Sequence, residues 1–283
     1  MFNFSAPKDI KFHVNKYILQ NQAWLKNKIV IDIPAGSGAA SQTLYSIGAK
    51  VEAYDLFPEF FKAKPLTCQY ANVLEKLPIA DNYADLVLCQ EGIEHFANQV
   101  KALQEFNRIL KPQGKLLITT PNYSNLRSKL SYFLAESEYV YHHLPPNEID
   151  SVWLAKKHPQ SEIYYGHIFL VGIQKLRVMA KLAGFKIAKI HPVRTNFTSL
   201  LILPFAYPFI WIANQLALWR SLQKHPNICK TYQKQVFREI TQLNLNIRIL
   251  THGHLFVEFE KEQELSEVAQ SLHGKYVSFE IVT

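Results

Sequence analysis

A turn that contains Gly36 and Gly38 is the stretch of the sequence best suited to bind a small ligand. Residues 29–41 read IVIDIPAGSGAAS, so apolar, β-favouring residues run into the turn and small residues follow it. Glycine has no Cβ, and the backbone can therefore turn sharply there and approach a ligand closely. The pattern predicts a binding loop between a strand and the N-terminus of a helix.

Asp32 indicates the charge of that ligand. Dinucleotide sites use a G-x-G-x-x-G loop to place a pyrophosphate on a helix N-terminus, which favours anions. A carboxylate in the preceding strand would repel a pyrophosphate, and Ser41 occupies the third glycine position of the pattern. A ligand that carries an ammonium and a sulfonium would be attracted instead. The loop therefore argues against an NAD-type oxidoreductase.

The spacing Asp32-x-x-x-Gly36-x-Gly38 resembles the first motif of class I S-adenosylmethionine-dependent methyltransferases, usually D-x-G-x-G-x-G. Pro34 replaces the first glycine, and proline fixes its own φ angle and lacks an N–H. Asp55 follows Gly38 by 17 residues and ends a second apolar strand. This is close to the place where a Rossmann-type unit carries the acid that binds ribose hydroxyls.

Residues 68–96 make the resemblance more specific, because they look like the type 11 class of these methyltransferases. The class has an acid or amide, a Leu-Pro pair, an Asp-Asn turn, a buried strand that begins with Asp, and a Glu-His pair. The matching positions, in order, are Asn72, Leu77-Pro78, Asp81-Asn82, Asp85–Cys89 and Glu94-His95. The family usually has Asp at position 72, but an Asn carbonyl oxygen can also accept from an adenine amino group.

The resemblance implies S-adenosylmethionine as cofactor and a set of residues that hold it. The Val73 N–H would serve an adenine ring nitrogen. The expected cofactor-binding residues are Asp32, Ala35, Gly36, Gly38, Asp55, Leu56, Asn72, Val73 and Gln90.

Two histidines are the candidates for catalysis. Methyl transfer from a sulfonium requires mainly alignment and exclusion of water, and a base is needed only for a weakly acidic hydroxyl. His95 follows a predicted strand at the edge where open α/β sheets bind ligands. His167 follows the turn 164–166, where family members often place acceptor contacts. Packing at a helix start remains an equal interpretation of His95, and Glu94 beside it is interpreted as a residue that caps or orients.

The composition describes a folded protein without a metal-binding cysteine pattern. The chain has 283 residues, 48% of them hydrophobic, and its Lys and Arg residues outnumber its acids to give a net charge of +8. Three separated cysteines favour a reducing compartment and argue against a zinc site. The N-terminus lacks a signal-peptide pattern, which predicts a cytoplasmic location. The positive charge is compatible with an anionic membrane surface or simply with a solvated basic face.

Strands and helices alternate along the chain, which predicts a Rossmann-like α/β fold. We expect seven mostly parallel strands, an antiparallel last strand at His254–Phe259, and helices on both faces. The predicted methyltransferase domain covers 1–260, with an apolar insertion at 195–240 between the last two strands. Residues 261–283 form a predicted C-terminal appendage with a helix-favouring piece and a β-like tail at 276–282.

The segment 195–219 contains no charged residue and is long enough to cross a membrane. Pro204 and Pro208 are predicted to interrupt its helix. A single crossing would also separate the last strand from its sheet, so the chain must return to the side it left. Three interpretations remain: a hairpin packed in the core, a lid over the acceptor pocket, or a patch in the membrane interface. Basic residues on both sides and two tryptophans suit the third.

The expected function is methyl transfer to a small or lipid-linked acceptor, with oxygen as the methylated atom, and a peripheral position at the inner membrane face. The alternatives are a non-catalytic scaffold that binds S-adenosylmethionine and a membrane-peripheral binding protein. Nucleic-acid methylation is disfavoured, because CQEG stands where an NPPY-type tetrapeptide would follow the fourth strand. No metal site is predicted.

Overall fold

A mixed sheet of seven strands organises the chain. The computed structural model describes residues 7, 9–137, 145–153 and 164–273, so the expected tail at 276–282 lies outside the described residues. The strands of the sheet are β1 (Ile29–Asp32), β2 (Lys50–Asp55), β3 (Cys68–Tyr70), β4 (Ala84–Gln90), β5 (Leu110–Pro121), β8 (Phe185–Ile190) and β9 (His254–Lys261). Their order is β3-β2-β1-β4-β5-β9-β8.

The pairing confirms the predicted fold class. Strands β1 to β5 pair with one another in parallel, whereas β9 runs antiparallel to both β5 and β8. The chain moves outward from β1 to β3 and then crosses back to β4 on the other side of β1. Ligands of open α/β sheets bind at such a reversal, beyond the carboxyl ends of the strands. The predicted glycine loop follows β1 at this point. A separate two-stranded ladder joins β6 (Val152–Trp153) and β7 (Tyr164–Tyr165).

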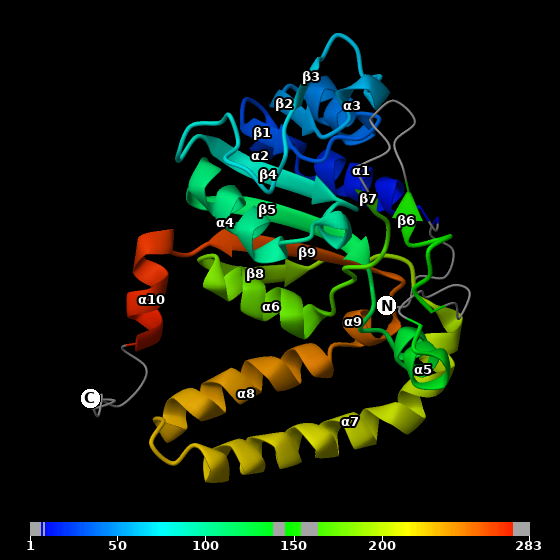
Figure 1. Cartoon of the computed structure of the whole chain (residues 1–283), viewed down its shortest axis with the longest axis vertical. Helices are drawn as coiled ribbons and strands as arrows, with labels where there is room; N and C mark the ends of the chain where they lie inside the picture. The colour runs from blue at the N-terminus through cyan, green and yellow to red at the C-terminus, as the bar shows by residue number, and fades with distance from the viewer. Residues whose placement is uncertain (1–6, 8, 138–144, 154–163, 274–283) are drawn as a thin grey trace.

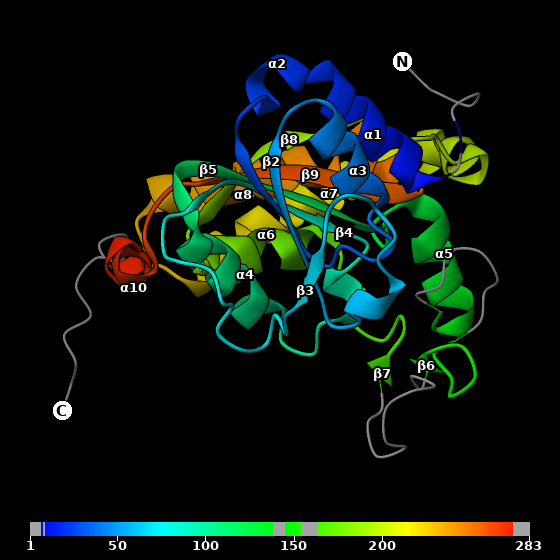
Figure 2. The same cartoon turned by 90° about the horizontal axis from the view of Figure 1, so that it is seen from above.

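Helices cover both faces of the sheet (Figures 1 and 2). One face carries α1 (Ile10–Gln20), α2 (Gln22–Leu25) and α3 (Ala39–Ser46), and the other carries α4 (Gln99–Ile109) and α6 (Ile173–Leu182). In β4, Leu86 and Leu88 pack toward the first group, whereas Val87 and Cys89 pack toward the second. Successive side chains of a strand point to opposite faces, so this apolar run fills two cores.

Short helical elements complete the described chain. Two 3₁₀ turns, η1 (Pro58–Phe60) and η2 (Ile93–His95), follow β2 and β4 at the carboxyl edge of the sheet. Helix α5 (Leu126–Ala135) follows β5, and α10 (Leu265–His273) lies within the predicted C-terminal appendage.

Three helices separate β8 from β9: α7 (Phe197–Lys224), α8 (Lys230–Asn244) and α9 (Ile247–Thr251). Figure 1 shows α7 and α8 side by side below the sheet. The predicted interruption at Pro204 and Pro208 is wrong, because both prolines lie inside one helix of 28 residues. Both are exposed. Water can therefore reach the carbonyl groups that lose their intrahelical partners, which lowers the cost of the missing bonds.

The interpretation of the apolar segment as a hairpin packed in the core is also wrong. The structure describes the whole of α7, and Ser199 and Asn214 are its only buried residues. Apolar side chains that the sequence would place inside a soluble core are instead open to solvent along this helix.

A buried carboxylate, Glu258, links the centre of β9 to both of its neighbouring strands. It accepts hydrogen bonds from Lys115 Nζ of β5 at 2.7 Å and from His191 Nε2, just after β8, at 2.8 Å. These partners hold the pKa of Glu258 at about 2, below its ordinary value of 4.5, although burial acts in the opposite direction. A carboxylate with a lowered pKa stabilises the fold while it is ionised.

We predict that Glu258→Gln lowers the free energy of unfolding at pH 7 by about 3 kcal/mol. In the natural chain, the stabilisation by ionised Glu258 is complete above about pH 5 and disappears as the pH falls toward 2. The reason is that the carboxyl group of the unfolded chain, which has the higher pKa, takes up its proton before that of the folded chain. Urea unfolding from pH 7 to pH 3 measures it. Glu260→Gln is the matched control, since Glu260 meets Lys186 at 3.5 Å on a more exposed part of the same strand. Equal losses in the two variants would contradict the assignment.

Candidate cofactor site and active site

The loop after β1 has the geometry that its glycines suggest. Gly36 and Gly38 have φ angles of +51° and +81°, in the left-handed region. A Cβ on Gly38 would lie 2.5 Å from the ring of Phe61, so a side chain is also sterically excluded there. Gly38 is the N-cap of α3. The loop therefore delivers the chain from β1 directly to a helix N-terminus at the carboxyl edge of the sheet.

Asp32 lies at the end of β1, behind this loop. It is buried, and the Ser41 hydroxyl donates a hydrogen bond to its Oδ2 at 2.5 Å. Burial raises the pKa of Asp32 to about 7, and the nearby charge of Asp55 adds to the rise, whereas the bonds from Ser41 oppose it. Ser41 occupies the position where a dinucleotide loop has its third glycine, and its hydrogen bonds favour the ionised form of Asp32.

Asp55 joins the loops that follow β1 and β2. Its Oδ2 accepts from the N–H of Gly36 at 2.7 Å, and its Oδ1 accepts from the N–H of Phe57 at 2.8 Å. One carboxylate therefore fixes two loops that come from segments far apart in the sequence. Carboxylate oxygens have about four lone-pair sites, so ribose hydroxyls can still bind there.

Two cavities open on either side of Pro34. The first, of about 300 Å³, is mostly apolar, and we call it the apolar cavity; the predicted residues that line it are Asp55, Leu56, Asn72, Val73 and His95. The second, of about 270 Å³, is called the acidic cavity; the predicted residues that line it are Asp32, Ala35, Gly36 and Gln90.

The predicted cofactor-binding residues thus gather around one point of the sheet edge. Gly38 lines neither cavity but shapes the loop between them. Asn72 Oδ1 already accepts from the N–H of Leu74 at 3.0 Å, and its Nδ2 donates to Glu75 at 3.1 Å. A planar, largely apolar group fits the apolar cavity. A cationic group fits the acidic one, where two acids outnumber the single lysine, Lys11, in the lining. Their roles toward a cofactor are proposals that binding experiments test.

Comparison with known proteins decides the family. Residues 31–118 match the type 11 family model, described as a methyltransferase domain. A demethylmenaquinone methyltransferase of Chlorobaculum parvum is 28% identical over 191 residues, which cover 61% of this chain and 71% of the relative. A ubiquinone biosynthesis O-methyltransferase of Xanthomonas oryzae is 32% identical over 127 residues, which cover 41% and 52% of the two chains.

The chain is a class I S-adenosylmethionine-dependent methyltransferase of the type 11 class. A solved S-adenosylmethionine-dependent methyltransferase of Archaeoglobus fulgidus shares the fold, with a TM-score of 0.51, 14% identity, and coverage of 89% of this chain and 94% of that one. The cofactor of the methyltransferase is S-adenosylmethionine, as the resemblance implied. The comparisons favour catalysis over the non-catalytic scaffold and over an oxidoreductase.

Two acids of the methyltransferase meet near the acidic cavity, and sequence reasoning missed the first of them. Glu91 lines that cavity, and among the described residues no group hydrogen-bonds to its buried Oε1. Glu94 is buried and accepts from the Thr120 hydroxyl at 3.0 Å. Burial raises the pKa of both carboxyl groups, and the charge of Glu94 raises that of Glu91 further. The sequence signal that could have identified Glu91 was its position directly after Gln90, at the end of β4.

The two candidate catalytic histidines lie side by side, although they are far apart in the sequence. The ring centroids of His95 and His167 are 5.4 Å apart. His95 Nδ1 lies 2.7 Å from the carbonyl oxygen of Gly166. Since a carbonyl only accepts, Nδ1 carries the proton and Nε2 keeps its lone pair in the neutral ring. The pKa of His167 lies below its usual value, because burial and the neighbouring His95 disfavour its charged form.

Glu94 joins this pair in a cluster that the sequence did not reveal. One potential ligand atom from each of Glu94, His95 and His167 lies within 4.8 Å of the others. The prediction that the site uses no metal stays a prediction. The side chains of this cluster are potential proton acceptors that lie beside the two cavities.

We predict that Asp55→Asn weakens the binding of S-adenosylhomocysteine by ten- to a hundredfold, because an amide replaces a charged acceptor that orders two loops. Isothermal titration calorimetry measures the change. Asp85→Asn is the matched control, since Asp85 accepts from the N–H of Ile29 and pairs with Lys28 at the start of the strands. An unchanged affinity in Asp55→Asn would contradict the role of Asp55.

Asp32 gives a second prediction, which concerns pH. We propose that its carboxylate attracts the ammonium of the cofactor, and binding then requires loss of a proton whose pKa is about 7. Affinity for S-adenosylhomocysteine should therefore fall as the pH drops from 8 to 5.5, by up to tenfold per unit below 7. Calorimetry across this range measures the slope. A slope of the same size in Asp32→Asn would contradict the assignment.

Proposed function

We propose that the methyltransferase methylates an oxygen atom of a lipid-linked, quinone-type acceptor at a membrane surface. The observation that carries the proposal is the exposed apolar helix α7. Its first residue, Phe197, lines a cavity together with His254, which lies 3.5 Å from Glu91. The relatives named above for menaquinone and ubiquinone biosynthesis support a quinone-type acceptor. A hydroxyl on an aromatic ring is the chemical group that such a site would methylate.

Helix α7 exposes large apolar side chains along its length. Among the described residues it is the one helix long and apolar enough to cross a membrane, and only 6% of its most apolar window is buried. Its exposed large apolar residues are Phe197, Leu201, Phe205, Tyr207, Phe209, Trp211, Ile212, Leu216 and Trp219. A surface of this kind on a folded protein marks a contact with another apolar phase.

The hairpin favours a helix that lies in the membrane interface over one that spans the bilayer. Helix α8 reads KTYQKQVFREITQLN and returns the chain to β9. If α7 crossed the bilayer, this charged helix would have to cross back at a large cost. Polar contacts also tie the two helices together, since Asn244 Nδ2 donates to Asn214 Oδ1 at 2.8 Å. Lysines and arginines on the hairpin suit an anionic surface.

The chain's own residues supply alignment and a proton acceptor. The cofactor supplies an activated methyl group when bound. Asp32 and Glu91 provide negative charge at the acidic cavity, and Asp55 provides acceptors at the apolar one. With the cofactor bound, His95 Nε2 would take the proton of the acceptor hydroxyl, whose oxygen is the methylated atom. Glu94 then stabilises the positive charge that develops on the ring of His95.

Turnover with defined acceptors tests the proposal. Purified full chain is mixed with S-adenosylmethionine and reduced quinones or catechols, with and without a prenyl tail, and the products are identified by mass spectrometry. We expect O-methylated product, and more of it from the prenylated acceptors in the presence of vesicles. Turnover of tail-free acceptors alone, or methylation on carbon, would overturn this part of the proposal.

We predict that His95→Gln lowers kcat by about a hundredfold or more, the usual contribution of a general base. Glutamine keeps a hydrogen-bonding side chain of similar reach but cannot take up the proton. Calorimetry with S-adenosylhomocysteine separates catalysis from binding, because His95 also lines the apolar cavity. His225→Gln, at the end of α7, is the control. A loss of cofactor affinity at unchanged kcat would contradict the assignment.

The membrane contact gives a separate prediction. Replacing Phe205 and Phe209 together by Asp places two charges on the exposed side of α7, and we expect binding to fall at least tenfold. Flotation with vesicles of phosphatidylcholine and phosphatidylglycerol measures it. Ile149→Asp, at an exposed residue outside the hairpin, should leave flotation unchanged. Equal flotation of the double variant and the natural chain would contradict a role for α7.

A further inference from the structure

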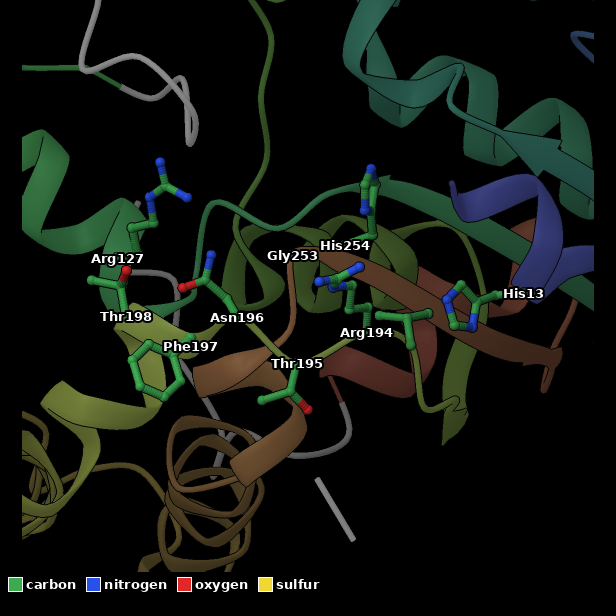
Figure 3. A pocket seen from close by; sticks show the side chains of 10 residues that line it. His13, Arg127, Arg194, Thr195, Asn196, Phe197, Thr198, Gly253 and His254 are labelled. Atoms are coloured by element: carbon green, nitrogen blue, oxygen red, sulfur yellow. The ribbon is translucent and has the colours of Figure 1, made fainter. Parts of the chain in front are cut away.

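A third cavity, of about 390 Å³, lies where α7 leaves the fold. Segments from four parts of the chain enclose it: α1, the start of α5, the loop from β8 into α7, and the start of β9. The lining residues are His13, Arg127, Val193, Arg194, Thr195, Asn196, Phe197, Thr198, Gly253 and His254. In Figure 3, Arg127, Asn196, Phe197 and Thr198 lie on one side, and His13, Arg194 and His254 lie on the other. The proposed methyl-transfer chemistry uses none of these residues.

The described lining is basic. It contains two guanidinium groups, Arg127 and Arg194, and two imidazoles, and none of the ten lining residues carries a carboxylate. Two acids lie outside this lining: Glu91 Oε2 is 3.5 Å from His254 Nε2, and the charge of Asp9 acts on His13 and His254. Burial lowers the pKa of His254 to about 4, so this ring is neutral near pH 7 and acts through hydrogen bonds. The arrangement suits an anion with several acceptor oxygens.

The helix ends that form one side of the cavity are held together. The N–H of Arg127 donates to the Ser199 hydroxyl at 3.0 Å, and that hydroxyl donates to Asn125 Oδ1 at 3.3 Å. Asn125 and Asn196 are the N-caps of α5 and α7. The positive ends of two helix dipoles therefore meet beside the cavity and add to the charge of the arginines.

An apolar surface begins at the same place. Phe197 lines the cavity and is itself exposed. Helix α5 packs against α7, and both present large apolar side chains to solvent. We call these residues the α5–α7 apolar surface: Leu130, Phe133, Leu134, Leu201, Phe205 and Phe209. A cationic cavity beside an exposed apolar surface matches a molecule with an anionic head and a hydrocarbon tail.

We propose that this cavity binds the phosphate group of a membrane phospholipid, whose hydrocarbon lies along the α5–α7 apolar surface. Arginine pairs with phosphate oxygens through two parallel hydrogen bonds, which a chloride or a headgroup without a phosphate cannot reproduce. The inference adds a specific headgroup site to the proposed membrane contact. It also sets the orientation of the chain, because His254 connects this cavity through Glu91 to the acidic cavity. A lipid held here brings the bilayer next to the active site.

Calorimetry with water-soluble lipids tests the headgroup site without vesicles or turnover. The full chain is titrated with dihexanoylphosphatidylglycerol below its micelle concentration, with dihexanoylphosphatidylcholine and with inorganic phosphate. We expect the phosphatidylglycerol to bind at one site, at least tenfold more tightly than inorganic phosphate. Equal affinity for inorganic phosphate would mean a simple anion site and would overturn the lipid assignment. No binding of any of the three would overturn the proposal.

A matched pair of variants separates this cavity from diffuse charge. Arg127→Gln with Arg194→Gln should weaken phosphatidylglycerol binding at least tenfold. Arg220→Gln with Lys224→Gln removes the same charge at the far end of α7 and should change it less than about twofold. Equal losses in both pairs would overturn the assignment. S-adenosylhomocysteine binding by each variant shows that the fold is intact.

A measurement on the natural chain covers the case in which the arginine variants do not fold. The imidazole resonances of His13 and His254 should shift when phosphatidylglycerol is added, whereas that of His225 should not. Shifts confined to His225 would overturn the proposal. Soluble-lipid binding without vesicle flotation would leave the headgroup site standing and contradict the proposed membrane contact of α7, so the two failures can be told apart.

Discussion

The carboxylate of Asp55 is the interaction on which the proposed cofactor site depends. The Ile33 and Ala35 N–H groups, directly after β1, donate to strands β4 and β2. Asp55 then holds the loops after β1 and β2 together through the N–H groups of Gly36 and Phe57. The acidic cavity forms on the Gly36 side and the apolar cavity on the Phe57 side. We expect the same order in the free chain, where it would reduce the conformational freedom lost on binding.

Local sequence signals predicted which residues gather at the carboxyl edge of the sheet, and the roles of these residues toward the cofactor stay predictions. Asp32, the glycines and Asp55 lie at strand ends, and parallel strands bring their carboxyl ends to one edge of a sheet. The active site was harder to predict, since Glu91 acquires its significance from a positive φ angle and an unmatched buried oxygen. His167 meets His95 only through tertiary structure, across the segment that contains α4, β5 and α5.

The insertion shows where pattern reasoning fails. Two prolines predict a break when a helix is assumed to be surrounded by protein, but on an exposed helix solvent can compensate for the lost hydrogen bonds. Because its side chains are exposed, the apolar segment is not part of the core and is instead a surface that a membrane can contact. The start of α7 lies near the acids of the proposed active site, since Phe197 and His254 line one cavity and His254 Nε2 is 3.5 Å from Glu91 Oε2. Such proximity is what a lipid-linked acceptor would require.

Hydrogen exchange of single backbone amides tests most directly whether the cofactor site is formed in advance. The N–H groups of Gly36 and Phe57 are measured by NMR in the free chain and in the presence of S-adenosylhomocysteine. The account predicts that both are protected already in the free chain, to a similar extent, and that the ligand adds little. Rapid exchange of both amides in the free chain, with protection only after the ligand binds, would contradict it.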